Sequence, residues 1–244
     1  GWDVYPDSAY EAAKKAGVLE ARDLEPIKDF LEGIKPWPAV FDPQYVKKLN
    51  GPNVKKGKST RALADQVSAD IERFRKEKGC ERLVMVWCGS TEVYREAGDV
   101  HSSIEKFEKG LDESHPDILP SMIYAYCAIK AGIPYNNGAP NLSADVPALI
   151  DLAKKTGSPI GGKDFKTGQT LMKTILAPGF KARLLGMNGW YSTNILGNRD
   201  GEVLDAPENF KSKEVSKLGV LDGILQPELY DELYGDIDHV VRIN

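Results

Sequence analysis

The 244-residue chain has few cysteines, few histidines and no long apolar run, and each shortage excludes a class of protein. Its three cysteines show no CxxC spacing, which argues against a zinc ribbon or a redox pair and predicts reduced thiols at Cys80, Cys88 and Cys127. Its three histidines lack metal-ligand spacing, so we predict no metal site. No run reaches membrane-spanning length and no signal-peptide core is present, which predicts a cytoplasmic protein.

A large excess of charge of one sign is also missing. The net charge of -4 and the pI near 5.6 give no general attraction to nucleic acid or to anionic lipid. Any anionic ligand would therefore need a local cluster of basic residues, and we predict a small-molecule partner, no nucleic acid and no membrane. A complete GxGxxG fingerprint, a P-loop and a GxSxG motif are absent as well.

Strand-like and helix-like segments alternate through the middle of the chain. Helical periodicity with plausible caps predicts helices over residues 60–79, 119–132, 144–156 and 168–177, the last ended by Pro178. Short apolar runs predict strands over residues 83–88, 133–135 and 158–160, and the first reads as buried on both faces. This alternation predicts an α/β domain with a largely parallel sheet.

The two ends of the chain have a different texture. The first fifty residues are interrupted by prolines and predict short helices wrapped over the sheet. From about residue 180 the pattern predicts a second, α+β region, with a long strand over 182–193, a turn-rich segment over 194–201 and a lysine-rich segment over 207–220.

Polar, glycine-bearing segments follow each predicted strand. In open parallel sheets ligands bind beyond the carboxyl ends of the strands. We therefore expect four polar side chains to face one crevice: Glu92, Asn136, Asn137 and Asp164. Each could also be an ordinary loop residue, and Asp164 could simply cap a helix.

Two lysine clusters are candidates for an anion site. Lys166 and Lys173 are two helical turns apart and follow a Gly161–Gly162 turn, an arrangement that suits a phosphate at a helix N-terminus. Lys213 and Lys217 are four residues apart and would project together from a second helix. Solvated helix faces are the alternative interpretation of both clusters.

Five segments in consistent order resemble motifs of the inositol-3-phosphate synthases, also called myo-inositol-1-phosphate synthases. Residues 161–173 resemble GDDxKSGQTxxK, residues 194–201 resemble NxLGNNDG, and residues 210–217 resemble FRSKEISK. Residues 137–140 are similar to NGSP and residues 87–94 to WTANTERY. Lys163, Ala139 and Leu171 depart from these patterns.

The resemblance implies a Rossmann-like NAD-binding portion over residues 1–179 and an α+β catalytic and oligomerisation portion over 180–244. The family's glycine-rich strand and loop would precede Gly1 and a further catalytic lysine would follow Asn244, so we expect the central portion of such an enzyme. The implied cofactor is NAD, and the implied assembly is a homotetramer.

The implied reaction converts D-glucose 6-phosphate to 1D-myo-inositol 3-phosphate through oxidation, enolisation, intramolecular aldol closure and reduction. Matching motif positions assign catalytic roles to Lys166, Lys173, Lys213, Lys217 and Asp238. They assign the cofactor side to Thr91, Glu92, Asn137, Gly138, Gly162 and Asp164. A non-catalytic α/β assembly unit and a lysine Schiff-base aldolase are the alternatives.

Overall fold

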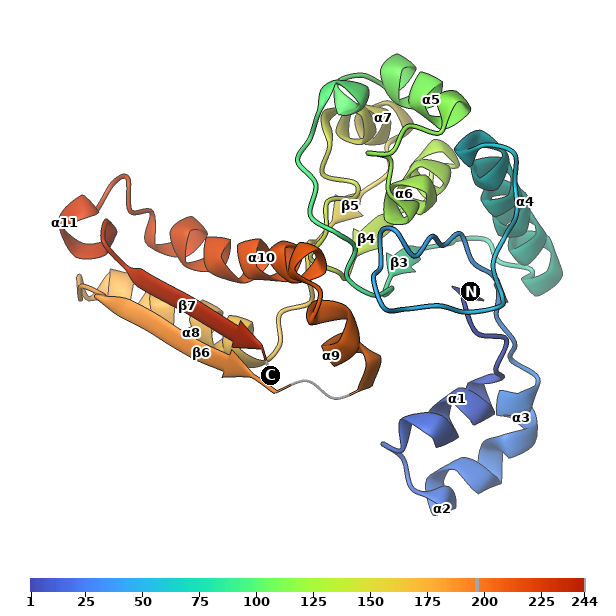
Figure 1. Ribbon diagram of the computed structural model, residues 1–244, viewed down its shortest axis with the longest axis horizontal. Coiled ribbons are helices and arrows are strands. Elements are labelled where there is room, and N and C mark those ends of the chain that lie inside the picture. Colours follow the sequence, from blue (N-terminus) through green and yellow to red (C-terminus); the bar gives the residue numbers. More distant parts are fainter. Residues whose placement is uncertain (196–197, 244) are drawn as a thin grey trace.

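The computed structural model describes residues 1–195 and 198–243 as helices packed on three small sheets, and each described strand pairing is parallel (Figure 1). The strands are β1 (Trp2–Asp3), β2 (Trp37–Pro38), β3 (Met85–Trp87), β4 (Tyr135–Asn137), β5 (Ile160–Gly161), β6 (Gly189–Asn194) and β7 (Asp238–Ile243). None of the described helices has both the length and the apolar character needed to cross a bilayer.

The helices vary from single turns to about five turns. They are α1 (Ala9–Ala16), α2 (Ala21–Leu24), α3 (Lys28–Glu32), α4 (Thr60–Lys78), α5 (Ile104–Glu113), α6 (Pro120–Lys130), α7 (Pro147–Thr156), α8 (Gly168–Ala182), α9 (Asn198–Leu204), α10 (Pro207–Leu225) and α11 (Asp231–Tyr234), with 3-10 turns η1 (Glu25–Ile27) and η2 (Asp99–His101).

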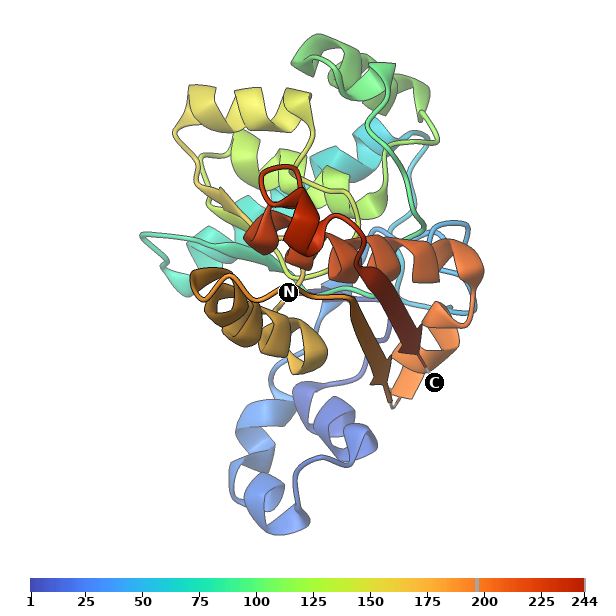
Figure 2. The same ribbon diagram turned by 90° about the vertical axis from the view of Figure 1, so that its left-hand side faces the viewer.

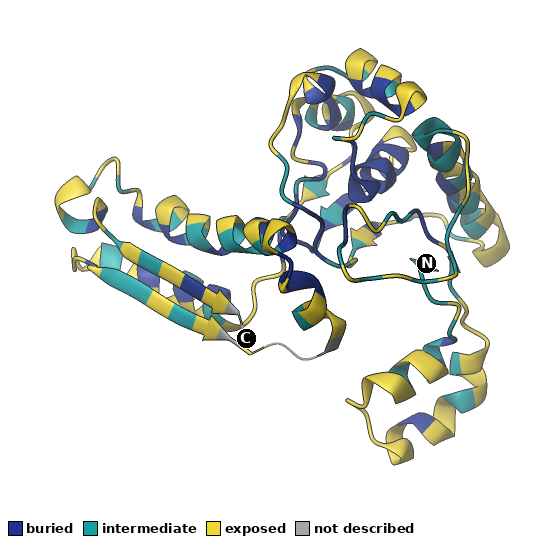
Figure 3. Cartoon of the chain, viewed as in Figure 1, coloured by how far each residue is buried: buried dark blue, intermediate teal, exposed yellow. Residues whose placement is uncertain are grey.

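The central sheet has the order β3-β4-β5 and packs with helices α4, α6 and α7 around the larger hydrophobic core. The capping residues predicted for α4 are present in the structure: Ser59 accepts a hydrogen bond from the Ala62 amide, and Gly79 ends the helix at a φ of 60°. Residues 120–129 of α6 are all buried, so this helix fills the centre of the core (Figure 3). The α/β fold class is therefore confirmed.

The expectation that residues 83–88 are buried on both faces is wrong. Met85 faces the core, whereas the side chains of Val84 and Val86 are 68% and 48% exposed. Successive side chains of a strand point to opposite faces of the sheet, so Val84 and Val86 lie on the face opposite Met85. In addition, β3 lies at one edge of the described sheet.

A second, smaller core lies between α8, α10, α11 and the β6-β7 pair, at the left of Figure 1. Ala177, Leu221 and Tyr234 are buried in it. Helix α8 does not stop at Pro178 as predicted but continues to Ala182, because packing of its buried face outweighs the loss of one backbone hydrogen bond. The predicted strand over 182–193 is correspondingly shorter and begins at Gly189.

The domain boundary predicted after residue 179 falls within α8. The turn-rich segment predicted over 194–201 includes the first residues of α9, and its residues 196–197 lie outside the described part of the chain.

The first fifty residues do contain short helices, but α1, α2 and α3 project away from the central sheet instead of wrapping over it (Figures 1 and 2). This segment also forms strands, since β1 pairs with β2. Trp2 anchors the pair to the larger core: its indole nitrogen donates to Asp70 over 2.7 Å, and its ring lies 5.1 Å from that of Tyr124.

Candidate active site

The ends of β4 and β5 form a closely packed pair of turns. The Gly138 amide donates to the Trp87 carbonyl over 2.8 Å, and the Asp164 amide donates to the Ala139 carbonyl over 3.1 Å. Gly162 has a φ of 123°, and a Cβ there would lie 2.6 Å from the Asn137 carbonyl oxygen. Glycine at this position therefore lets the chain after β5 approach β4 and fixes where Asp164 emerges.

Asp164 is the centre of the candidate site. Its side chain is buried and accepts hydrogen bonds from Lys213 Nζ over 2.8 Å and from Ser216 Oγ over 3.3 Å, both on α10. It does not cap α8, whose N-cap is Thr167. The structure thus brings together a carboxylate after β5 and an ammonium group 49 positions later in the sequence.

Two further lysines lie beyond this ion pair, on the facing sides of α8 and α10. Lys217 Nζ lies 3.5 Å from Thr170 Oγ1. Lys173 is fully buried, and its Nζ donates to the Lys217 carbonyl over 2.6 Å and lies 2.7 Å from His239 Nε2. Solvated helix faces, the alternative interpretation of the two clusters, do not describe these two side chains.

The fourth predicted lysine lies at the exposed rim. Lys166 Nζ donates to the Lys163 carbonyl over 2.9 Å, and Lys163 forms an ion pair with Asp145 over 3.0 Å. Desolvation lowers the pKa of Lys166, an effect that Asp164 opposes and Lys213 reinforces. Lys166 therefore shares the electrostatic environment of Asp164 and Lys213.

Burial is the main influence on the pKa of the inner amines. It lowers the pKa of Lys173 to about 8, with the Lys217 charge adding to the effect. It also lowers the pKa of Lys217, where the Lys213 charge contributes next. His239 has its pKa lowered to about 4, first by burial and then by the Lys173 charge. Amines with lowered pKa values exchange protons more readily near neutral pH.

Asp238 and His239 point to opposite faces of β7, because side chains alternate along a strand. The exposed Asp238 accepts a hydrogen bond from the Tyr191 hydroxyl over 3.0 Å, so the structure does not bring its carboxylate to the lysines. His239 contacts Lys173 instead. His239 was not among the predicted site residues. The strand at residues 238–243 was not predicted either, and the alternation of its side chains is the signal that could have identified His239.

The residues predicted for the cofactor side have partners within the protein. Glu92 is fully buried, and its carboxylate accepts hydrogen bonds from the Ser121 amide over 2.9 Å and from Asn141 Nδ2 over 2.8 Å. Burial raises the pKa of Glu92 to about 7, against the effect of the Ser121 hydrogen bonds. The Asn137 amide bonds to the backbone of Ala139 and Asn141.

Thr91 contributes its carbonyl oxygen to the contact with α10, where it accepts from Asn209 Nδ2 over 2.8 Å. Gly138 and Gly162 lie in the turns after β4 and β5. Glu92 and Asn137 both bond to Asn141, whereas Asp164 bonds to α10. The expectation that Glu92, Asn136, Asn137 and Asp164 face one crevice stays a prediction.

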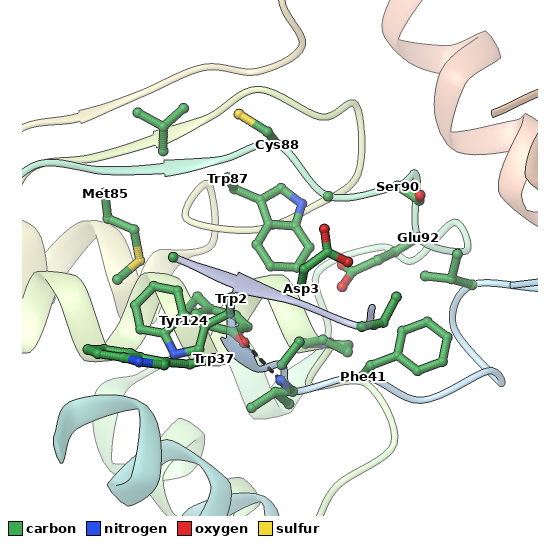
Figure 4. Close-up of a pocket in the computed structure, with 18 of the residues that line it drawn as sticks. Trp2, Asp3, Trp37, Phe41, Met85, Trp87, Cys88, Ser90, Glu92 and Tyr124 are labelled. Carbon is green, nitrogen blue, oxygen red and sulfur yellow. Dashed lines mark hydrogen bonds between the residues drawn. The ribbon is translucent and has the colours of Figure 1, made fainter. Parts of the chain in front are cut away.

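A cavity of about 640 Å³ runs along β3 and past its carboxyl end (Figure 4). Aromatic side chains form much of its wall, and residues 88–90 and Glu92 lie at its polar end. The indole nitrogen of Trp87, which also lines the cavity, is buried and has no hydrogen-bond partner among the described residues. The volume, the ring faces and this unused donor fit part of a dinucleotide such as NAD.

The described residues contain no group of three or more histidine, cysteine, aspartate or glutamate side chains placed to hold a metal ion. The cavity and the lysines are joined through the strand ends, since the Trp87 carbonyl accepts from Gly138 and the Gly138 carbonyl accepts from the amide of Phe165.

Comparisons with known proteins agree in pointing to one family. A family model for an NAD-binding domain, described as myo-inositol-1-phosphate synthase, matches residues 1–225. Inositol-3-phosphate synthase 1 of Bacteroides thetaiotaomicron is 54% identical over 245 residues, which cover all of this chain and 57% of that relative. Inositol-3-phosphate synthase 1 of Oryza sativa subsp. japonica is 34% identical over 250 residues, which cover all of this chain and 48% of that relative.

A solved structure extends the likeness to three dimensions. The inositol-3-phosphate synthase of Caenorhabditis elegans superposes with a TM-score of 0.93 at 30% identity, covering 100% of this chain and 48% of that one. The chain therefore spans about half the length of the proteins to which it is similar.

Proposed function

Because the chain belongs to the NAD-binding myo-inositol-1-phosphate synthase family, we propose that it carries the lysine-rich active site of an inositol-3-phosphate synthase. The proposed reaction turns D-glucose 6-phosphate into 1D-myo-inositol 3-phosphate by oxidation, enolisation, aldol closure and reduction. NAD, when bound, would supply the oxidation and the final reduction. The observation that carries the proposal is a cluster of four lysines at one place. Lys213 binds the buried Asp164, whose charge also acts on Lys166 and Lys217. Lys173 joins the cluster through its contact with the Lys217 carbonyl.

The substrate phosphate would bind at the N-terminus of α8. Thr167, the N-cap of this helix, makes no side-chain capping bond, so the first turn presents backbone donors together with the positive end of the helix dipole. Lys166 directly precedes the N-cap residue of α8 in the sequence. Lys213, on α10, binds Asp164 in the turn that leads into α8. Charged donors and backbone amides together are what phosphate binding requires.

The lysines would stabilise the negative charge that develops during enolisation and ring closure. Asp164 holds the Lys213 ammonium group in one position through the 2.8 Å contact, so this positive charge does not have to be organised during the reaction. Lys173 and Lys217, whose pKa values are lowered, would be suited to exchange protons with the substrate near neutral pH.

The cavity along β3 would hold the cofactor. Trp87 would offer its unpaired indole nitrogen, and Gly138 lets the Phe165 ring pack closely against the strand end. Glu92 would shape the polar end of the cavity from its hydrogen-bonded position. The homotetramer implied by the resemblance and the cytoplasmic location expected from the sequence composition stay predictions.

The test uses the longest form of the protein that contains this chain. With NAD present, we expect acid-stable, periodate-sensitive inositol phosphate to form from glucose 6-phosphate. Lys166→Ala and Lys213→Ala should each lower the rate by about 100-fold or more, because each removes a charge aimed at the substrate. Lys211→Ala is the matched control, since Lys211 lies on the same helix and pairs with Glu214 in solvent.

Full activity in the Lys166→Ala/Lys213→Ala double variant would reject the proposed site. A lysine Schiff-base aldolase is the second candidate, favoured by the pKa of about 8 at Lys173. Borohydride in the presence of a sugar phosphate separates the two, because it would fix an imine at Lys173 as a covalent adduct. Turnover without such an adduct supports the synthase, whereas no turnover and no adduct supports a non-catalytic assembly unit.

A further inference from the structure

Strand β7 delivers a histidine to the most deeply buried lysine of the site. His239 Nε2 lies 2.7 Å from Lys173 Nζ, and the Lys217 carbonyl accepts from the same Nζ over 2.6 Å. The indole ring of Trp190, on the neighbouring strand β6, lies 5.8 Å from Nζ. Two polar atoms on β7 and α10 and one ring face on β6 therefore surround this amine.

The charges nearby decide which of the two groups carries the proton. Lys217 disfavours a charge on Lys173, and the Lys173 charge disfavours one on His239; Asp222 on α10 acts in the opposite direction on both. The pKa values of about 8 for Lys173 and about 4 for His239 leave an ammonium group facing a neutral imidazole at pH 7. A neutral imidazole can accept at Nε2 only when its own proton lies on Nδ1.

We propose that His239 is a positioning residue for Lys173. Its imidazole accepts one N–H of the ammonium group, the Lys217 carbonyl accepts another, and the third is left pointing in one direction. The use of that third N–H by a substrate oxygen rests on the proposed function, whereas the positioning itself does not. This role differs from packing, because it depends on an acceptor at the place of Nε2.

Lysine titration in the 244-residue chain tests the proposal without any substrate. Nuclear magnetic resonance of lysines labelled with ¹³C at Cε follows each amine, and Lys173→Arg assigns the signal. We expect His239→Leu to lower the pKa of Lys173 by about one unit, because the acceptor that stabilises the ammonium form is lost. His239→Gln, which keeps an acceptor near the place of Nε2, should leave the pKa close to its original value.

His115→Leu is the control, since His115 lies on the loop after α5 beside Asp117, away from the lysines. A Lys173 pKa that is unchanged in His239→Leu would overturn the proposal, as would equal shifts in His239→Leu and His239→Gln. ¹⁵N shifts of His239 in the unsubstituted protein give a second answer that needs no variant. An unprotonated Nε2 at pH 7 supports the proposal, and a protonated Nε2 rejects it.

The outcome is separable from that of the proposed reaction. Expected shifts at Lys173 together with no inositol phosphate would reject the reaction and retain the positioning role. If inositol phosphate forms but His239→Leu leaves the Lys173 pKa unchanged, the reaction is retained and the positioning role is rejected. In an active protein, His239→Leu should lower kcat about tenfold with little change in KM, and His239→Gln should restore most of it.

Discussion

Lys173 shows at the scale of one residue how this fold accepts an unfavourable group. Its side chain is fully buried between α8, α10 and β7. Within the described part of the chain, its amine forms no ion pair, and the neighbours of Nζ are a carbonyl oxygen, an imidazole and a ring face. Burying a charge without an opposite charge disfavours the charged form, which is why the pKa of Lys173 falls to about 8. We infer that the buried Lys173 lowers the stability of the folded protein and supplies it with an amine of lowered pKa.

A pH-dependent difference in stability should follow from Lys173. The folded protein releases this proton near pH 8 and the unfolded chain near 10.5, so between these values the unfolded state holds more protons and stability rises with pH. Relative to Lys173→Met, the free energy of unfolding of the original protein should therefore increase from pH 8 to 10.5, by about 3 kcal/mol in total.

Urea denaturation of both proteins at several pH values measures this difference, and titrating groups that do not interact with Lys173 cancel between them. Between pH 7 and pH 8, above the titration of His239, the difference should change little. A difference that stays constant up to pH 10.5, or that falls, would show that the lysine is not held in the manner described.

At the scale of one element, the turn between β5 and α8 determines where the site lies. Gly162 takes a φ of 123° that other residues rarely adopt, and it passes against the backbone of Asn137 at the end of β4. The turn then places Asp164 against Ala139 and starts α8 at Gly168. A few residues therefore join the sheet, the carboxylate and the lysine-bearing helix.

Gly162→Ala should reduce both stability and activity. The added Cβ would lie 2.6 Å from the Asn137 carbonyl oxygen and at an unfavourable φ, so we expect a loss of about 2 kcal/mol or more in the free energy of unfolding. Gly179→Ala in the interior of α8 is the control, because its Cβ meets open space and the substitution should stabilise the helix by about 0.5–1 kcal/mol. Thermal unfolding measures both, and equal behaviour of the two variants would contradict the account.

At the scale of the whole molecule, α10 joins the two hydrophobic cores (Figure 1). At its first turn, Asn209 Nδ2 donates to the carbonyls of Tyr45 and Thr91, and Ser212 Oγ donates to the carbonyl of Glu92. Toward its other end, Leu221 and Leu225 are buried in the smaller core. The lysines of α10 lie between these anchors, so the geometry of the site depends on both ends.

Removing the first anchor should uncouple the two cores. In Asn209→Ala/Ser212→Ala, three backbone carbonyls lose their side-chain donors, and we expect the unfolding transition to divide into two steps with an overall loss of about 2–4 kcal/mol. Trp87 reports on the larger core and Trp190 on the smaller one, so single-tryptophan fluorescence resolves the steps. Lys211→Ala, at an exposed position of α10, should leave the transition unchanged.

The sequence by itself determined the features that depend on near neighbours. The caps at Ser59 and Gly79, the alternation of strands and helices, and the spacing of Lys213 and Lys217 are short-range properties, and they predicted α4, the parallel α/β fold and a lysine-bearing helix. The family resemblance added which lysines are expected in one site, and in the structure Lys213 binds Asp164 while Lys173 contacts the Lys217 carbonyl.

Only the tertiary structure decided the rest, because it depends on contacts between residues far apart in the chain. Lys173 meets the Lys217 carbonyl across 44 positions and His239 across 66, and no local pattern predicts either contact. Long-range packing likewise carries α8 past Pro178. Strand alternation and edge position, known only once strands are paired, turn Asp238 away from the lysines and leave Val86 exposed.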